Sequence, residues 1–370
     1  MNKKGGIYTA IECFCGPGGL GLGLENAGFD VKFAFDIDAP SVRTYCRNQG
    51  PKAEVRDIRK MRGRDLLAAA GIVNKLNLLS GGPPCQGFSK QKRGAHLGDE
   101  RNDLVLEFAR LVRETTPNFF LMENVAMLGQ KRGKEFIDKF KSLVSDYNLY
   151  PHFYNCADYG LAQTRQRFVI VGKHSSIKSD FYIPSPIDTK WKTVAEVIGD
   201  LPEPPADYSD HPGYPNHQNA RVTPINIKRF SFVPQGGGWQ DIPRHLRITA
   251  HKNSNTKAGG WPDVYGRLKW NGQCPTITGG FDSFTRGRYG HPAQNRPLTP
   301  REAARLQGFP DWYVFEGNRG DIRSQIGNAV PPPLAEALGK AMLSAIENDA
   351  ARIAGKAKRR DIQITAELSL

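Results

Sequence analysis

The hydrophobic positions in the first half of the chain alternate between two periods. Short apolar runs predict strands near residues 7–14, 31–36, 53–55, 76–79, 119–122, 150–155 and 167–172. Between them, apolar positions at helical spacing predict helices that end near residue 27 or cover residues 39–48, 102–115 and 134–145. Alternating β and α elements with almost continuously apolar strands predict an α/β fold: a Rossmann-like, doubly wound, mostly parallel sheet.

A second kind of sequence begins after residue 183, where prolines become frequent and helical periodicity fades. Residues 334–346 are again amphipathic, and we expect this helix to pack back on the first domain. The pattern predicts a first domain at residues 1–183, completed by residues 321–347, and a smaller, irregular domain at residues 184–320. Residues 348–370 are expected to form a mobile tail.

Chemically distinctive residues follow the ends of the predicted strands. The glycine loop at residues 16–21 follows the first strand, and Asp36, Asp57, Cys85 and Glu123 end or follow four others. In doubly wound sheets, ligands bind at the carboxyl ends of the strands. We therefore expect these five positions to share one edge of the sheet and to form the functional site.

The glycine loop reads GPGGLG and matches the GxGxxG pattern, with Asp36 twenty residues after Gly16. Glycines let a ligand approach the backbone closely, and the carboxylate can accept hydrogen bonds from ribose hydroxyls. Asp57 could accept a hydrogen bond from an adenine amino group. The loop indicates an adenosine cofactor and leaves NAD and S-adenosylmethionine equally open.

Cys85 lies in the stretch GGPPCQGFS, directly after an apolar strand. The two prolines fix backbone angles, and the glycines allow a bulky group to come close. This setting favours a rigidly held, partly open thiol that acts as a nucleophile. The alternative is an ordinary strand-to-loop turn that contains a cysteine.

The net charge of +14 over 370 residues is concentrated in one segment. Residues 221–296 hold 12 Lys or Arg against 3 Asp and no Glu, a net charge of +9, and three of the five tryptophans. Basic loops with interleaved aromatic residues are typical of a surface that binds nucleic acid. The alternative is an irregular, solvated domain.

The six cysteines include no CxxC pair, so no metal site is predicted. The chain has no apolar run long enough for a membrane span and no secretory signal. We therefore expect a cytoplasmic protein with reduced cysteines and no membrane partner.

Together with the motifs ENV at residues 123–125, QTRQR at 163–167, RPLTPRE at 296–302 and QIGNAV at 325–330, the sequence resembles the C5 cytosine-specific DNA methyltransferases. The resemblance covers about residues 7–172 and 265–347, and no catalytic position departs from the family pattern. It implies transfer of a methyl group from S-adenosylmethionine to carbon 5 of a cytosine in a specific double-stranded DNA sequence. The target base would be flipped out of the duplex.

The resemblance also implies residue roles. Cys85 would add to carbon 6 of the cytosine as a thiolate, and a protonated Glu123 would bind ring nitrogen 3. Arg165 and Arg167 would hold the base carbonyl oxygen and orient Glu123. The implied cofactor pocket consists of Phe14, Gly16, Pro17, Gly18, Asp36, Ile37, Asp57, Ile58, Pro84, Leu104, Asn328 and Ala329.

Residues 184–320 would then be a target-recognition domain. Arginine, lysine and threonine side chains can contact base edges or phosphates. The candidate DNA-binding residues are Gln86, Ser89, Lys90, Lys92, Arg93, Arg267, Thr276, Thr278, Arg286 and Arg288. Residues 87–102 suit a lid that closes over the flipped base, with a plain surface loop as the alternative.

Three other functions remain open at this point. A transfer-RNA cytosine C5-methyltransferase of the same fold would use the same cysteine, although the long basic segment favours DNA. A DNA-binding relative without turnover is opposed by the intact catalytic motifs, and an NAD oxidoreductase leaves GGPPCQGFS unexplained. A DNA methyltransferase of this kind acts alone or beside a restriction endonuclease that cuts the same site without forming a stable complex.

Overall fold

A seven-stranded sheet organises the first domain. The computed structural model describes residues 8–84, 103–129, 134–187, 190–252 and 263–367. The strands are β1 (Tyr8–Cys13), β2 (Phe29–Asp36), β3 (Ala53–Val55), β4 (Leu78–Gly81), β5 (Phe119–Val125), β6 (Tyr147–Asn155) and β8 (Gln166–His174). They lie in the order β3-β2-β1-β4-β5-β8-β6; the first five are parallel, and β8 is antiparallel to both neighbours. The predicted α/β class with a mostly parallel sheet is confirmed.

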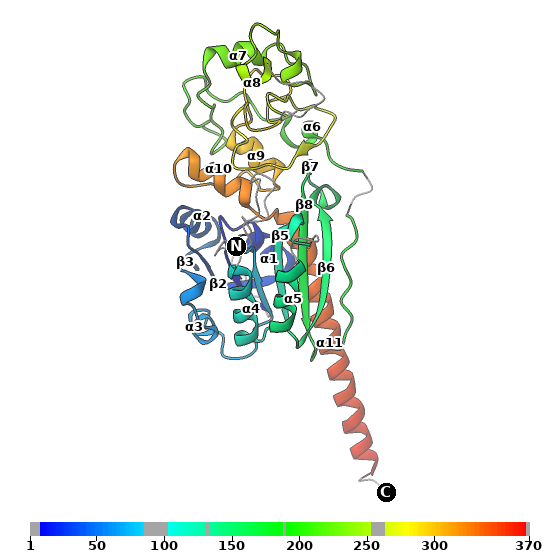
Figure 1. The fold of residues 1–370 in the computed structure, drawn as a ribbon. Helices are drawn as coiled ribbons and strands as arrows, with labels where there is room; N and C mark the ends of the chain where they lie inside the picture. The colour runs from blue at the N-terminus through cyan, green and yellow to red at the C-terminus, as the bar shows by residue number, and fades with distance from the viewer. Residues whose placement is uncertain (1–7, 85–102, 130–133, 188–189, 253–262, 368–370) are drawn as a thin grey trace.

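Helices cover both faces of this sheet (Figure 1). Residues of α3 (Gly63–Ala69), α4 (Asp103–Thr115) and α5 (Lys134–Leu143) share one hydrophobic core with the strands. Residues of α1 (Gly19–Ala27) and α11 (Pro332–Glu367) form the core on the other face, and α2 (Ala39–Gln49) packs beside them over β2 and β3. The short helix α3 was not predicted, since its segment has little apolar periodicity.

Helix α11 packs on the first domain as expected, because Leu334, Leu338 and Met342 are buried against Leu20 and Leu24 of α1. Residues 348–367, which the sequence assigned to a mobile tail, continue this helix to Glu367 and extend past the body of the domain (Figure 1). The middle of α11 is anchored to the first domain, because Asp349 accepts hydrogen bonds from the backbone N–H groups of residues 178 and 179. Neither α11 nor another helix in the described ranges is apolar enough to cross a membrane.

The region after residue 183 contains little regular structure. It holds the helices α6 (Val194–Ile198), α7 (Pro224–Phe230), α8 (Thr249–Lys252) and α9 (Pro300–Leu306), and α10 (Arg319–Asn328) follows. A small aromatic core lies inside it: the ring centroids of Phe230 and Phe284 are 4.2 Å apart, and Tyr265 stacks on Phe284 at 5.8 Å. In Figure 1, α7 and α8 lie farthest from the sheet, and α9 and α10 lie between them and the sheet.

Two short strands join this region to the first domain. Strand β7 (Gln163–Thr164) pairs in parallel with β9 (Cys274–Pro275). The backbone of Gly327 also approaches residues 278 and 279 so closely that a Cβ atom would lie 2.4 Å from the Gly279 nitrogen. Only glycine fits there without moving one of the two backbones.

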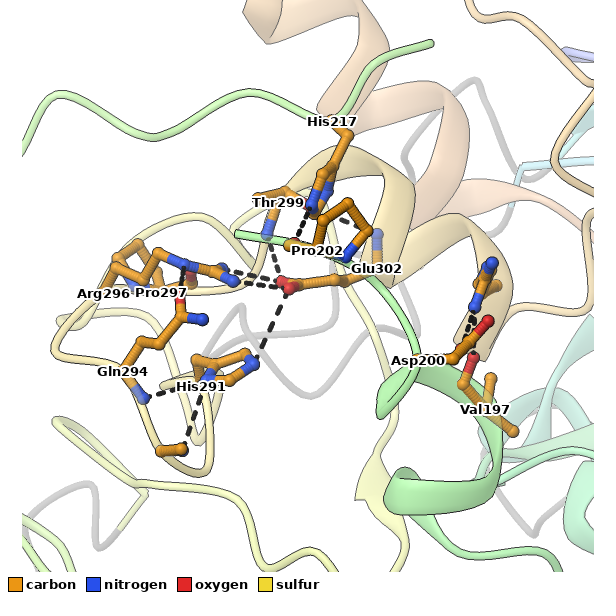
Figure 2. Close-up of polar contacts among 12 residues, drawn as sticks. Val197, Asp200, Pro202, His217, His291, Gln294, Arg296, Pro297, Thr299 and Glu302 are labelled. Atoms are coloured by element: carbon orange, nitrogen blue, oxygen red, sulfur yellow. Dashed lines mark hydrogen bonds and ion pairs between the residues drawn. The ribbon is translucent and has the colours of Figure 1, made fainter. Parts of the chain in front are cut away.

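The RPLTPRE motif forms a buried polar cluster beside this joint (Figure 2). The Glu302 carboxylate accepts hydrogen bonds from both guanidinium NH2 groups of Arg296, at 2.9 and 2.6 Å, and from the Thr299 backbone at 2.8 Å. His291 Nε2 lies 3.8 Å from the same carboxylate, and the Thr299 hydroxyl contacts His217. The ion pair lowers the pKa of Glu302, although burial alone would raise it. The motif therefore shapes the start of α9.

Candidate active site

The parallel register of β1 to β5 brings the predicted site residues to one edge of the sheet. The glycine loop follows β1, Asp36 ends β2, Asp57 follows β3, and Glu123 lies near the end of β5. Strand β4 ends at Gly81, directly before the cysteine loop. From β1 the chain continues to β2 and β3 on one side of the sheet, and from β4 it continues to β5 on the other side. The carboxyl ends of β1 and β4 therefore form the switch point at which such sheets bind ligands.

The residues around Gly16 form an open cradle. The Asp36 carboxylate accepts hydrogen bonds from the Gly16 N–H at 2.8 Å and the Asp38 N–H at 2.9 Å. Gly16 has a φ of +51°, and a Cβ placed on it would meet no atom within 4 Å. Beside it the Ile37 side chain is 65% exposed, and Phe14 holds a positive φ of 53°, a conformation that is strained for a bulky side chain. A backbone cradle, a carboxylate and an exposed apolar side chain fit an adenosine group.

Burial raises the pKa of Asp36, and the hydrogen bonds from the Asp38 and Gly16 backbones oppose this rise. Asp57 differs: its carboxylate caps the turn at Arg59 and pairs with the Arg59 guanidinium at 2.8 Å, which lowers its pKa. Ile58 is only 3% exposed and belongs to the core of the sheet.

The other expected cofactor residues lie near the same edge. Leu104 is partly buried against the core of the sheet, and Pro84 is the last described residue before the cysteine loop. Asn328 ends α10 with an exposed side chain, and Ala329 after it is buried. Pro17 and Gly18, both within the glycine loop, are buried.

The Glu123 carboxylate lies beside the start of the cysteine loop. Arg167 Nε contacts Glu123 Oε1 at 2.7 Å, and both side chains are only 11% exposed. Asn124 Nδ2 donates a hydrogen bond to the Pro83 carbonyl at 2.9 Å. A Cβ placed on Gly82 would lie 3.4 Å from Glu123 Oε2. The ENV motif thus holds the two residues that lead into the loop and directs its carboxyl group toward them.

Several predicted residues lie outside the described part of the chain. They are the nucleophile Cys85 and the candidate DNA-binding residues Gln86, Ser89, Lys90, Lys92 and Arg93, all within residues 85–102. The expected lid at residues 87–102 lies there too.

Arg165 is 1% exposed and joins three parts of the chain. Its guanidinium donates to the carbonyls of Ile277 at 2.8 Å, Gly327 at 3.0 Å and Ala329 at 3.1 Å, while its Nε has no hydrogen-bond partner among the described residues. The sequence predicted that Arg165 and Arg167 both orient Glu123, whereas the ion pair among the described residues joins Glu123 to Arg167. Burial, and then the nearby Arg167 charge, lower the pKa of Arg165. Arg165 is therefore a buried cation held by backbone carbonyls close to the site.

The expectation that Arg267 reads a base is wrong. Its side chain is buried, with the residue 5% exposed, and its guanidinium lies 4.0 Å from the centroid of the Phe230 ring. It donates hydrogen bonds to four backbone carbonyls and one side-chain amide, namely those of Phe230, Val233, His291, Gln294 and Asn295. All its donor groups are engaged inside the domain, so none can reach a base edge.

The other sequence-reading candidates divide into two groups. Arg288 is also used internally: it donates to the carbonyls of Gly236 and Gly237 and pairs with Asp263. Thr276 and Thr278 are half-buried beside the QTRQR motif, where the Thr276 hydroxyl donates to the Thr164 carbonyl at 3.2 Å. Arg286 is exposed, and among the described residues no ion pair or hydrogen bond engages its guanidinium.

Sequence reasoning missed two buried residues of the site. Gln163 is fully buried; its amide nitrogen donates to the Leu306 carbonyl, and its amide oxygen accepts from the Ile277 N–H at 2.8 Å. It therefore aligns the two short strands behind Arg165. Glu12 is a buried carboxyl group within β1, directly before the glycine loop. A charged residue in an otherwise apolar strand was the signal that could have identified it.

The strand order, the glycine loop and the Asp36 carboxylate define the class of protein: an α/β enzyme that binds a nucleoside cofactor at the switch point of its sheet. A family model described as C-5 cytosine-specific DNA methylase matches residues 8–344. The chain belongs to this family, and its members take the methyl group from S-adenosylmethionine. The expected enzyme class and cofactor are confirmed, and the NAD alternative is excluded.

Individual relatives cover nearly the whole chain. The Type II methylase M.HgiDII of Herpetosiphon aurantiacus is 35% identical, over 92% of this chain and 96% of the relative. The Type II methyltransferase M1.HphI of Haemophilus parahaemolyticus is 34% identical, over 92% and 88%. A crystal structure of a DNA modification methyltransferase encoded within an Escherichia coli prophage superposes with a TM-score of 0.70 at 30% identity, over 92% of this chain and 99% of that one. A Dnmt2 methyltransferase of S. pombe, at 17% identity, is similar in fold alone.

Proposed function

We propose that the protein methylates carbon 5 of one cytosine within a specific double-stranded DNA sequence, as a modification enzyme of the restriction-modification kind or as a solitary methylase. The observation that carries this proposal is the buried Glu123–Arg167 ion pair at the entry of the cysteine loop. It provides an oriented carboxyl group beside Gly82 and Pro83, the residues that lead toward Cys85 in the sequence. The relatives named Type II methyltransferases support the choice of DNA as substrate.

The reaction requires a nucleophile because carbon 5 of cytosine is too electron-poor to accept a methyl group directly. The Cys85 thiolate forms a bond to carbon 6, and the displaced electron pair makes carbon 5 nucleophilic. S-adenosylmethionine would supply the methyl group to carbon 5, and its sulfur would keep the electron pair of the broken S–CH3 bond. A base removes the carbon-5 proton, the electron pair of that C–H bond restores the ring double bond, and Cys85 leaves with the electrons of its bond to carbon 6.

Negative charge develops on the ring while the cysteine is bound. Glu123 in its protonated form binds ring nitrogen 3, and Arg167 fixes the carboxyl group in that orientation. Arg165 supplies a second cation whose charge no carboxylate contacts directly, since its described bonds go to carbonyls. In a site closed to water, such preorganised charges stabilise the developing anion strongly.

The cradle formed by Phe14, Gly16, Asp36 and Ile37 is proposed to hold the adenosine part of the cofactor. Asp36 accepts from the ribose hydroxyls, and the exposed Ile37 packs on the adenine ring. Asp57 borders the adenine, although its carboxylate is shared with Arg59. Asn328 and Ala329 close the pocket from the end of α10.

The target-recognition domain is proposed to bind the duplex through its exposed cations. Arg286 is the strongest candidate of the described set, with Thr276 and Thr278 beside the site. Flipping the base out costs a few kcal/mol of unstacking, which contacts between the protein and the DNA must offset. The protein acts in the cytoplasm, and an endonuclease of the same specificity is a separate enzyme that forms no stable complex with it.

Bisulfite sequencing of DNA from Escherichia coli that expresses the protein tests the proposal directly. We expect one sequence context to be methylated, and expression of Cys85→Ser to leave the same DNA unmethylated. A duplex that carries 5-fluorocytosine at the site should then trap a covalent adduct, because fluorine cannot leave as a proton. Methylation by the Cys85→Ser variant, or no adduct with the wild-type protein, would contradict the mechanism.

The transfer-RNA alternative is tested in the same preparation. Purified protein is incubated with radiolabelled S-adenosylmethionine and either the duplex or total transfer RNA from Escherichia coli that does not express the protein. We expect label in the duplex and none above background in the RNA. Label in the RNA alone would overturn the choice of substrate and leave the cysteine chemistry intact.

A further inference from the structure

A group of buried oxygen atoms lies behind the glycine loop. Glu12 is 1% exposed, Tyr45 of α2 is fully buried, and Gln49 lies one turn after Tyr45. Both carboxyl oxygens of Glu12, the Tyr45 hydroxyl and the Gln49 amide oxygen lack a hydrogen-bond partner of good geometry among the described residues. A buried polar atom without a partner is costly, so four of them in one place need an explanation.

These atoms converge on one point beside α1. A Cβ placed on Gly21 would lie 2.4 Å from Glu12 Oε2, 2.6 Å from the Tyr45 hydroxyl and 3.1 Å from Gln49 Oε1. The three side chains come from β1 and α2, and Gly21 lies in the first turn of α1. The oxygens therefore share one small space that is formed by three elements.

The Gln49 amide connects this space to the cofactor cradle. Its Nε2 donates to the Gly18 carbonyl and to the Tyr313 hydroxyl, both at 2.8 Å. The Tyr313 hydroxyl in turn donates to the Pro17 carbonyl. Both amide hydrogens are used, and the Gln49 amide oxygen is left as an acceptor in the same space as the Glu12 and Tyr45 oxygens. Tyr313 belongs to the segment between α9 and α10, which lies beside the second domain.

Counting protons shows which form of Glu12 completes the network. The Tyr45 hydroxyl brings one hydrogen, and a neutral Glu12 carboxyl group brings a second. The two hydrogens then satisfy the Gln49 oxygen and the carbonyl oxygen of the carboxyl group, whereas an ionised Glu12 leaves the single Tyr45 hydrogen to serve three acceptor oxygens. Burial raises the pKa of Glu12 to about 8, and the nearby Tyr45 hydroxyl and Gly21 N–H only partly oppose this rise. The other ionisable groups that face this carboxyl group are Cys13, Cys15, Glu25, Lys52 and Tyr313.

We infer that Glu12, Tyr45, Gln49 and Tyr313 form a positioning network that holds the glycine loop in the shape the cofactor requires. The network touches the loop from behind, at the Pro17 and Gly18 carbonyls, and does not contact the cofactor. This inference rests on the proposed cofactor cradle. It adds a role for the segment that carries Tyr313, which becomes part of the cofactor site by way of the loop.

Tyr313→Phe is the sharpest test, because it removes one hydroxyl and keeps the buried ring. Tyr147→Phe is the matched control: its hydroxyl also donates to a proline carbonyl, that of Pro117, in another part of the domain. Binding of S-adenosylhomocysteine to the purified full-length proteins is measured by isothermal titration calorimetry. We expect Tyr313→Phe to weaken binding about tenfold, the equivalent of about 1.4 kcal/mol, and Tyr147→Phe to change it less than about twofold.

Steady-state kinetics separates positioning from a general loss of structure. Tyr313→Phe should raise KM for S-adenosylmethionine by a similar factor and leave kcat within about twofold of wild type. Equal affinity of Tyr313→Phe, Tyr147→Phe and wild type would overturn the inference. Failure of the wild-type protein itself to bind S-adenosylhomocysteine would instead contradict the proposed cofactor cradle.

Two substitutions of Glu12 test the proton count. Glu12→Gln keeps a neutral donor and acceptor and should bind S-adenosylhomocysteine within about twofold of wild type at pH 7, whereas Glu12→Leu should lose about tenfold or more. Between pH 7 and pH 9 the wild-type protein should lose affinity relative to Glu12→Gln, a comparison in which titration of the ligand cancels. Parallel pH profiles of the two proteins, or equal affinities of the Gln and Leu variants, would overturn the role of Glu12. If the Glu12 variants do not fold, the Tyr313 pair decides.

Discussion

The two regions of this protein provide hydrogen-bond partners for their backbone N–H and C=O groups in different ways. In the first domain the sheet ladders and helices pair most backbone groups, and the interior is almost entirely apolar. In the second region few strands or helices form, and arginine side chains donate to backbone carbonyls that regular structure would otherwise satisfy. Arg267 engages four such carbonyls, and Arg301 engages three, those of Pro215, Pro310 and Tyr313.

This difference changes the meaning of the positive charge. Five of the 12 basic residues between positions 221 and 296 donate to carbonyl groups within the protein: Arg229, Arg247, Arg267, Arg288 and Arg296. A net charge of +9 therefore overstates the charge available to DNA phosphates. The aromatic residue Trp239 likewise serves the interior of the protein: it is buried, and its ring centroid lies 4.7 Å from that of His251, on which it stacks. Many of the arginine and aromatic residues whose abundance is typical of nucleic-acid binding thus stabilise the fold of this loop-rich domain instead.

The largest expected effect concerns the chemistry of the first domain. Glu123→Gln should lower the methylation rate by about 10²- to 10⁴-fold, because the amide cannot supply the proton for ring nitrogen 3. Its free energy of unfolding should change by less than about 1 kcal/mol, since glutamine can still accept from Arg167. Single-turnover methylation and urea unfolding measure the two quantities.

Glu114→Gln is the control for this substitution, because Glu114 also pairs with an arginine, Arg110 at 2.9 Å, away from the site. It should leave the rate unchanged. A wild-type rate for Glu123→Gln would remove this carboxyl group from the mechanism.

The second effect concerns the scaffold of the other region. Arg267→Met keeps the volume of the side chain and removes its five hydrogen bonds, which leaves buried carbonyls without donors. We expect a loss of about 3 kcal/mol in the free energy of unfolding, measured in urea.

Arg286→Met is the matched control, since Arg286 is exposed, and its stability should stay within about 0.5 kcal/mol of wild type. Equal stability of the two variants would contradict the scaffold role of Arg267.

A smaller effect should appear in the pH dependence of stability. The pKa of Glu12 rises from 4.5 to about 8 on folding, so between these pH values the folded protein binds one proton more than the unfolded chain. Stability from this group therefore falls as pH rises, by about 1.4 kcal/mol per pH unit, and the fall ends above pH 8.

The free energy of unfolding of Glu12→Gln, measured at pH 6, 7 and 8, should lack this contribution. A constant difference between wild type and variant across the three pH values would show that Glu12 does not titrate in this range.

The smallest effect concerns DNA affinity. Arg286→Ala should weaken binding of duplex DNA by about 5- to 10-fold and make the slope of log affinity against log salt less steep by about 1. Fluorescence anisotropy with a labelled duplex at several salt concentrations measures both. Unchanged affinity and slope would show that the exposed Arg286, like the buried arginines of this region, does not contribute to DNA binding.

Much of the first domain followed from its sequence. Apolar runs and helical spacing located the strands β1 to β5 and the helices α2 and α4 to within a few residues, because both kinds of element pack against one continuous core. The shared edge of the site also followed, since parallel strands all end at the same edge. The spacing of the glycine loop and Asp36 also agrees with the structure, in which the Gly16 N–H donates to the Asp36 carboxylate.

The tertiary structure decided what each polar side chain contacts. Spacing could not distinguish Arg267, whose guanidinium is enclosed by four carbonyls from two separate segments, residues 230–233 and 291–294, from the exposed Arg286. Nor could it assign the Glu123 ion pair to Arg167, or pair the Gln49 amide with the Tyr313 hydroxyl. Periodicity records which face of an element is buried, because burial is a property of local sequence. Hydrogen-bond partners come from residues far apart in the chain, so they exist only once the chain has folded.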